Sequence, residues 1–168
     1  LFLKENAKPM TFLDLIPIAL LSGFLLVAVC IDHRSHRIPN WLTGTMLLVG
    51  ISTQTLTAGF QGLGSALAGM LVGLAVFLLP YIQRSMAAGD VKLMAAVGAF
   101  IGAKLVLLAA VVSLVAGASI GLTLLAYRQI HKTNTSVDGI LSMKFPYASA
   151  IAIGTAVALV TKEFQWTL

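Results

Sequence analysis

Charged residues are scarce in this sequence. Only 10% of the 168 residues are Asp, Glu, Lys or Arg, whereas soluble domains carry about 25%. Together with 58% hydrophobic residues and a mean hydropathy of +0.96, this composition excludes an ordinary soluble domain and predicts a polytopic membrane protein. The net charge of +5 comes from single basic residues between apolar runs. Because they form no basic stripe, we predict no nucleic-acid partner.

Cysteine and histidine are also rare. The single cysteine, Cys30, excludes an internal disulfide and a zinc site built on two cysteines, and its apolar surroundings predict a packed small hydrophobe. His33 and His36 have the spacing of a metal-binding pair on a helix, but a proline ends their segment and no further His or Cys is near. We therefore predict neither a metal site nor a cofactor. His131 stands alone in a polar segment and is interpreted as solvent-exposed.

Long apolar runs alternate with short polar segments. A helix needs about 20 residues to cross a hydrocarbon core about 30 Å thick. Residues 93–127 would form one helix about 52 Å long, so we expect this run to turn at Gly102, Ala103 and Lys104. The predicted fold class is all-α, a single membrane-embedded domain (residues 1–168) with a bundle of six transmembrane helices. Their expected ranges are 11–31, 41–56, 63–82, 87–103, 105–126 and 146–160.

The distribution of basic residues predicts orientation, because cytoplasmic loops carry an excess of Lys and Arg. Seven such residues fall on one side of the predicted bundle, namely Arg34, Arg37, Arg84, Lys92, Arg128, Lys132 and Lys144. Four fall on the other side, namely Lys4, Lys8, Lys104 and Lys162. We therefore expect both termini outside. The first run is interpreted as a membrane span and not as a cleaved signal peptide, since positive charges follow it and no small-residue cleavage pattern ends it.

Two acids mark predicted cytoplasmic ends of helices. Asp32 ends the first apolar run and Asp90 begins the fourth, so both are expected at one depth on one side. An ionisable side chain at membrane depth costs a few kcal/mol and usually faces the bundle interior or a water-filled cavity. Glycines four residues apart would allow close helix packing, although glycine is also common in membrane helices. These pairs are Gly69 and Gly73, Gly98 and Gly102, and Gly117 and Gly121.

Two neighbouring carboxyl groups can share one proton, because a like charge raises the pKa of one of the pair. The ionised acid can take a proton from water as the water attacks a peptide carbonyl, while the protonated acid supports the developing oxyanion. Asp32 and Asp90 are therefore candidates for aspartyl-protease chemistry.

Other interpretations remain open. In a purely structural one, Asp32 pairs with Arg34 or Arg37, and Asp90 pairs with Lys92 or Arg84 at a helix start, where negative charge is favourable. The protein would then be a structural membrane subunit.

The acids also suit a small proton- or cation-coupled transporter or channel, with Asp14 as a third group. The absence of polar side chains between Leu93 and Ala103 argues against a path across the membrane. We interpret Asp14 as a solvated residue near the outer end of the first run. An intramembrane aspartyl protease acting on other membrane segments is a further alternative.

Three stretches resemble the type IV prepilin peptidase family, membrane aspartyl proteases with a Gly-x-Gly-Asp motif. They are DHRSHRIPNWLT at 32–43, AAGDVKLMAAVGAFIG at 87–102 and KFPYASAIAIG at 144–154. The resemblance implies that Asp32 and Asp90 are the catalytic pair. It implies further that two sets of residues support them. One shapes the second motif, namely Ala88, Gly89, Val91 and Lys92, and the other forms the turn after the first acid, namely Arg37, Ile38, Pro39 and Asn40.

The sequence departs from the family pattern in two respects. Ala87 stands where the family has the first motif glycine, which adds bulk and restricts the backbone there. With one cysteine and a short first cytoplasmic segment, the chain resembles the short, peptidase-only form without the Cys-x-x-Cys region associated with N-methylation.

The resemblance also implies a function, a location and partners. The expected reaction is hydrolysis of the leader peptide bond of type IV pilin-like precursors at the cytoplasmic face of the inner membrane. The expected partners are a precursor with a basic leader and an apolar helix, the lipid membrane, and components of pilus or secretion assembly.

Overall fold

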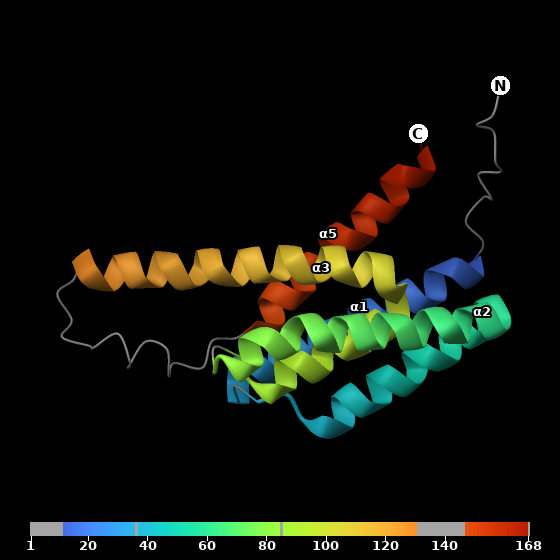
Figure 1. The fold of residues 1–168 in the computed structure, drawn as a ribbon, viewed down its shortest axis with the longest axis horizontal. Helices are drawn as coiled ribbons and strands as arrows, with labels where there is room; N and C mark the ends of the chain where they lie inside the picture. Colours follow the sequence, from blue (N-terminus) through green and yellow to red (C-terminus); the bar gives the residue numbers. More distant parts are fainter. Residues whose placement is uncertain (1–11, 36, 85, 131–146, 168) are drawn as a thin grey trace.

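The computed structural model describes residues 12–35, 37–84, 86–130 and 147–167 (Figure 1). They form four helices, α1 (Phe12–Ser35), α2 (Asn40–Ile82), α3 (Ala88–Ile130) and α5 (Tyr147–Thr167). The described residues contain no strand, which confirms the all-α fold class. Helices satisfy their own backbone hydrogen bonds, so they are the form that such apolar sequences take in lipid.

Helices α2 and α3 each double back on themselves (Figure 1). Each has 43 residues and as a straight helix would be about 64 Å long, twice the hydrocarbon thickness. Gly59 (φ 58°, ψ −137°) and Gly102 (φ 77°, ψ 173°) interrupt the helical backbone, in conformations that L side chains avoid. We call the two parts of each helix its first and second arms.

The break at Gly102 confirms the predicted turn. The break at Gly59 lies between the expected second and third spans, 41–56 and 63–82. Apart from Gly59, the residues between those ranges are helical, because a single glycine suffices to reverse the chain. Helix α5 extends to Thr167, past the end of the expected sixth span, 146–160, and its apolar part is Tyr147–Thr161.

The first arm of α3 is the centre of the fold. All of its residues from Leu93 to Phe100 are buried. Phe24 of α1 packs against Phe100 with ring centroids 6.4 Å apart, and both arms of α2 pack along the same arm. On the first arm of α2, Gly50 contacts the Phe100 ring. The segment that carries Asp90 is therefore enclosed by other helices.

Glycines allow the second arm of α2 to approach this central arm closely. Gly69 lies against the backbone of Gly98 and Gly102, and Gly73 lies against the backbone of Met94. The predicted role of these two glycine pairs is confirmed. The third pair does not have this role, since Gly117 faces the Tyr147 side chain and a Cβ atom added to Gly121 would meet nothing within 4 Å.

Gln54 connects the first arm of α2 to the break in α3. Its Nε2 donates a hydrogen bond to the carbonyl oxygen of Phe100 at 2.7 Å. A helix break leaves the preceding carbonyls without intrahelical donors, and an unpaired carbonyl at membrane depth is costly. Gln54 therefore satisfies a polar group that the turn at Gly102 exposes.

We expect Gln54→Leu to lower the free energy of unfolding by about 1–3 kcal/mol, because the Phe100 carbonyl loses its donor in an apolar setting. Thermal unfolding in detergent would measure the loss. Gln61→Leu is the matched control, since Gln61 is exposed. Equal melting temperatures for the two variants would contradict the role given to Gln54.

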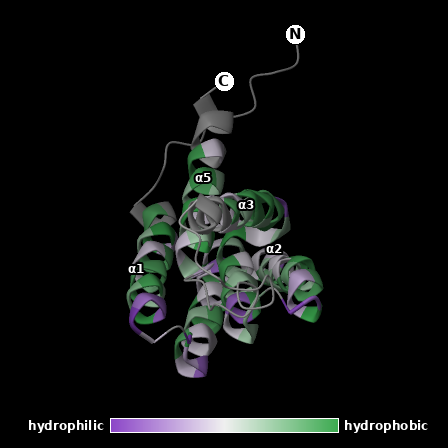
Figure 2. Ribbon diagram, turned by 90° about the vertical axis from the view of Figure 1, so that its left-hand side faces the viewer, coloured by the Kyte–Doolittle hydropathy of each residue, from purple (hydrophilic) through white to green (hydrophobic). Residues whose placement is uncertain are grey.

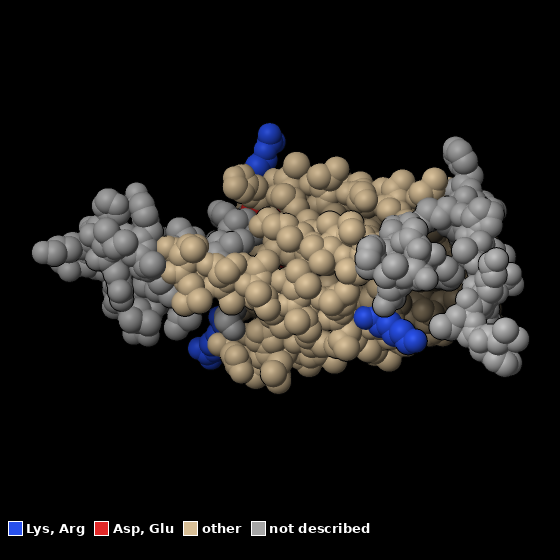
Figure 3. Space-filling view, turned by 90° about the horizontal axis from the view of Figure 1, so that it is seen from above, with Lys and Arg blue, Asp and Glu red and all other residues tan. Residues whose placement is uncertain are grey.

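Most of the outer surface is apolar. Large side chains stand exposed along every helix, including Leu26, Leu48, Leu79, Val115 and Val160. Figure 2 shows hydrophobic residues along the helices, and the face in Figure 3 carries few Lys or Arg among its described residues. Three helices, Leu15–Ser35, Asn40–Ile82 and Ala88–Thr123, are long and apolar enough to cross a membrane, and Tyr147–Thr161 is a shorter apolar helix. These features are those of an integral membrane protein.

Cys30 lies on this outer surface. It is exposed, so the expectation of a packed small hydrophobe is wrong. Leu26, one turn earlier on α1, is also exposed at 68%. Because α1 is apolar on all sides, the sequence does not mark which face packs inward.

Candidate active site

Asp32 lies within the last turn of α1. The helix continues to Ser35, past the end of the expected first span at residue 31, so Asp32 and His33 belong to the helix. The Asp32 side chain is 4% exposed. Its Oδ2 accepts a hydrogen bond from the backbone N–H of Ala148, at 3.1 Å. The end of α1 and the first turn of α5 therefore meet at this carboxylate.

Asp90 is the third residue of α3 and is 5% exposed. Its Oδ2 accepts a hydrogen bond from the N–H of Ala87 at 3.2 Å, and its own N–H donates to the Ala87 carbonyl at 3.1 Å. The bond from the Ala87 N–H to the Asp90 side chain is one half of a helix N-terminal capping box, and the Ala87 backbone carbonyl takes the place of the other half. Ala87, in place of the family's glycine, thus anchors Asp90 through its backbone.

The structure brings the two acids together. Asp32 and Asp90 are close enough for their carboxyl groups to interact electrostatically. The segments that carry them also pack against each other. A Cβ atom built on Gly89 would lie 3.2 Å from Cβ of Ile38, which is itself 9% exposed. The turn after the first acid therefore supports the first turn of α3.

Lys92 and Asn40 join the same two segments at the surface. The Lys92 Nζ donates a hydrogen bond to Asn40 Oδ1 at 2.8 Å. Asparagine often caps helices, but here Pro39 occupies the N-cap position of α2 and no side chain caps it. The Asn40 amide oxygen instead binds a lysine 52 residues further along the chain.

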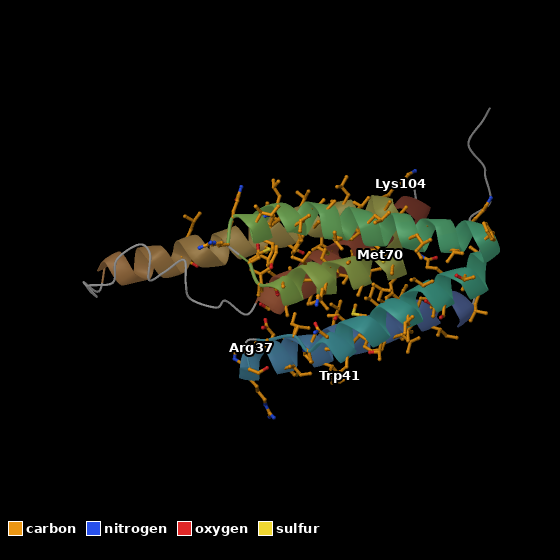
Figure 4. The ribbon with its side chains drawn as sticks, turned by 60° about the horizontal axis from the view of Figure 1, so that its bottom comes forward. Arg37, Trp41, Met70 and Lys104 are labelled. Atoms are coloured by element: carbon orange, nitrogen blue, oxygen red, sulfur yellow. The ribbon has the colours of Figure 1, made fainter. Side chains whose placement is uncertain are left out.

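The ion pairs of the structural interpretation are not formed. Within the described ranges, Asp32 and Asp90 each accept a backbone hydrogen bond, and neither pairs with a Lys or Arg. Arg37 is exposed and lies near one end of the bundle, whereas Lys104 lies towards the other (Figure 4). Ala88 is also exposed, on the first turn of α3. Two buried carboxyl groups that pair with no Lys or Arg of the described ranges suit acid–base chemistry.

Among the described residues, no three His, Cys, Asp or Glu side chains gather as a metal site would require. His33 is exposed in the last turn of α1. His36 and His131 lie outside the described residues, as does the side chain of Asp14.

Sequence reasoning missed the contribution of α5. Tyr147 and Ala148 fall within the stretch 144–154 that carried the third resemblance, but no role was predicted for either. Ala148 acts through its backbone N–H, which gives no signal in a sequence. Tyr147 is close enough to interact electrostatically with Asp90, and its position next to the proline was the one available signal.

Comparison with known proteins gives two matches. The profile of the type IV leader peptidase family matches residues 19–122, a range that contains both acids. A prepilin leader peptidase/N-methyltransferase from Aeromonas hydrophila is 32% identical over 149 residues, which cover 84% of this chain and 48% of that protein. The chain thus spans about half the length of this curated relative. No solved structure matches the chain.

Proposed function

Because this chain belongs to the type IV leader peptidase family, we propose that it hydrolyses the leader peptide bond of type IV pilin-like precursors. The observation that carries the proposal is the pair of buried acids, Asp32 and Asp90, at the ends of two helices whose adjoining segments pack together at Ile38 and Gly89. The relative from Aeromonas hydrophila, named a prepilin leader peptidase, supports this substrate class.

The proposed mechanism uses Asp32 and Asp90 as an aspartic pair. One carboxyl is ionised and takes a proton from a water molecule that attacks the scissile carbonyl carbon. The other is protonated and donates a hydrogen bond to the carbonyl oxygen as negative charge develops there. Collapse of the tetrahedral intermediate breaks the C–N bond, and the leaving amine receives the proton that the ionised acid took from water, which restores the pair. No step requires a metal or a cofactor.

The backbone donors at the two acids support this assignment. The N–H groups of Ala148 and Ala87 each occupy one oxygen of a carboxyl group, at 3.1 Å and 3.2 Å. Each acid thereby keeps its second oxygen for water or substrate. Such donors are in place before substrate arrives, so orientation costs little during the reaction.

We propose that the two arms of α2 and of α3 cross the membrane separately, which with α1 and α5 gives six spans in one domain. The reversals at Gly59 and Gly102 support this topology. The end that carries Asp32, Arg37 and Asp90 would face the cytoplasm, with both termini outside the inner membrane. A precursor whose basic leader meets an apolar helix at that depth would present the junction of leader and helix to the two acids.

The proposed further partners of this chain are components of pilus or secretion assembly.

A proton or cation pathway is less well supported. Such a pathway needs ionisable groups at several depths, and both buried carboxylates of the described residues lie at one end of the bundle. The buried hydroxyls of Ser113 and Thr155 donate to carbonyls of their own helices. We therefore favour hydrolysis over transport.

The test is cleavage of a pilin-like precursor by membranes that carry this chain. We expect one new product, cut at the junction of leader and apolar helix, as identified by mass spectrometry. A precursor with the same apolar helix and a scrambled leader is the control. Failure to cut any precursor, or equal cleavage of the scrambled one, would contradict the proposed substrate.

The contact between Lys92 and Asn40 yields a smaller prediction. We expect Lys92→Met to lower kcat/KM about 3- to 10-fold, because an exposed hydrogen bond contributes modestly to the position of the two segments. Asn40→Ala should have a similar effect, and the double variant should lose little more than either single one. Lys104→Met, at the other end of the bundle, is the control. Additive losses would show that the two side chains act separately.

A further inference from the structure

The first turn of α5 reaches the acid pair at Asp32. Ala148 donates its backbone N–H to the Asp32 Oδ2 at 3.1 Å. That N–H is the one hydrogen-bond donor that the described part of the chain offers to the Asp32 carboxylate. The position of the first turn of α5 therefore decides how this carboxylate is oriented.

Tyr147 occupies a space that a glycine leaves open. Its ring meets Phe77 of α2 edge to face, with centroids 6.3 Å apart and an angle of 82° between the rings. Its hydroxyl end lies over Gly117 on the second arm of α3. A Cβ atom built there would overlap the Tyr147 hydroxyl oxygen, Cζ and Cε2. The ring is thus held between two helices, and any side chain at position 117 would displace it.

A second close contact holds α5 further along. Gly154 packs against the carbonyl of Ala109 and against Ser113, both on the second arm of α3. Residue numbers rise along α5 as they fall along α3, so the two segments run antiparallel. Figure 1 shows α5 crossing this arm. With Gly154 fixed, the contact between Tyr147 and Gly117 sets where the first turn of α5 lies.

We propose that the contact between Tyr147 and Gly117 positions the first turn of α5 so that Ala148 holds the Asp32 carboxylate in its working orientation. Tyr147 is then a positioning residue, which acts through Ala148. The inference rests on the proposed function in one respect, namely that Asp32 is catalytic. A misplacement of about 1 Å in a catalytic group can cost about 10²-fold in rate, so a small shift of α5 would be visible in kcat.

Two glycine substitutions test the proposal. We expect Gly117→Ala to lower kcat at least about 10-fold with less than about a 2-fold change in KM, because precursor binding is unchanged while Asp32 is misplaced. Gly121→Ala, one turn further on the same helix, is the matched control, since its added methyl meets nothing within 4 Å. Wild-type kinetics for Gly117→Ala would overturn the proposal.

Variants of Tyr147 separate ring packing from hydroxyl chemistry. Tyr147→Phe keeps the ring and should retain kcat within about 3-fold, whereas Tyr147→Leu should lose about as much as Gly117→Ala. The double variant Gly117→Ala/Tyr147→Leu should be no slower than Tyr147→Leu, because the overlap at position 117 is gone. Losses that multiply in the double variant, or a Tyr147→Phe variant as slow as Tyr147→Leu, would overturn the proposal.

A labelling experiment tests the position of α5 without relying on activity. In a Cys30→Ala background, Ala148→Cys places a thiol at a site that is 0% exposed. We expect a charged maleimide to label this thiol slowly, because a buried thiol is shielded from aqueous reagents. Adding Gly117→Ala should raise the labelling rate at least about 10-fold, whereas adding Gly121→Ala should leave it unchanged. Equal labelling rates for Ala148→Cys alone, with Gly117→Ala and with Gly121→Ala would overturn the proposal, whether or not a precursor is cleaved. A failure to cleave any precursor would instead count against the proposed function.

Discussion

Asp32→Asn and Asp90→Asn should each lower kcat for precursor cleavage at least about 10³-fold, the scale of removing one member of a catalytic unit. Asparagine has nearly the volume of aspartate, and its oxygen can accept the same backbone hydrogen bond, from Ala148 or from Ala87. It can neither take a proton from water nor share one with the other acid. The chemistry should therefore be lost while the helix ends stay in place.

The measurement is the time course of cleavage by membranes that hold equal amounts of each variant. Asp14→Asn is the matched control, since residue 14 lies at the end of α1 opposite to Asp32. The double variant should be no slower than either single one, because the two acids act as a unit. If one asparagine variant kept cleavage within about 10-fold of wild type, that acid would be a structural residue and not a catalytic one.

The sequence identified the two acids because of where they lie along the chain. Asp32 and Asp90 each fall where an apolar run meets polar residues, and helices of membrane-spanning length bring such ends to one depth. Hydropathy also placed the reversal at Gly102, since no single helix of that length suits a membrane. The acids' catalytic role came from the resemblance and stays a proposal.

The errors arose where contacts between distant residues decide the outcome. Asn40 has a high intrinsic preference for helix caps, but its side chain binds Lys92 instead. Residues 57–62 fall between two expected spans, but apart from Gly59 they are helical, because one glycine suffices to reverse the chain. Cys30 was expected to be packed, but in a helix that is apolar all round, composition does not tell the packed face from the outer face.

The contribution of α5 was missed for a related reason. Donation from the Ala148 N–H depends on the placement of a helix and not on the identity of the residue. Gly117 and Tyr147 are 30 residues apart, and their contact is visible only once α3 and α5 are packed together. Sequence patterns therefore located the acids, whereas the structure was needed to show what holds them.

Close backbone packing at Gly69 and Gly98 gives the largest expected effect on stability. A methyl group added to Gly69 would overlap the carbonyl oxygen of Gly98, and one added to Gly98 would overlap that of Gly69. Backbone atoms cannot move aside as a flexible side chain can, so the second arm of α2 would have to separate from the first arm of α3. We expect either Gly→Ala variant to lose more than about 3 kcal/mol of unfolding free energy, above the usual range for overpacking.

Gly64→Ala is the control, because it lies on the same arm of α2 and its added methyl meets nothing within 4 Å. It should be neutral or stabilising by up to about 1 kcal/mol, since alanine is the better helix former. Thermal unfolding in detergent would compare the three. The separation would also reach the active site, because Asp90 lies in the first turn of the central arm that carries Gly98. Gly69→Ala and Gly98→Ala should therefore lower both the cleavage rate and the free energy of unfolding. A variant that kept wild-type cleavage and wild-type stability would show that the two arms need no such close approach.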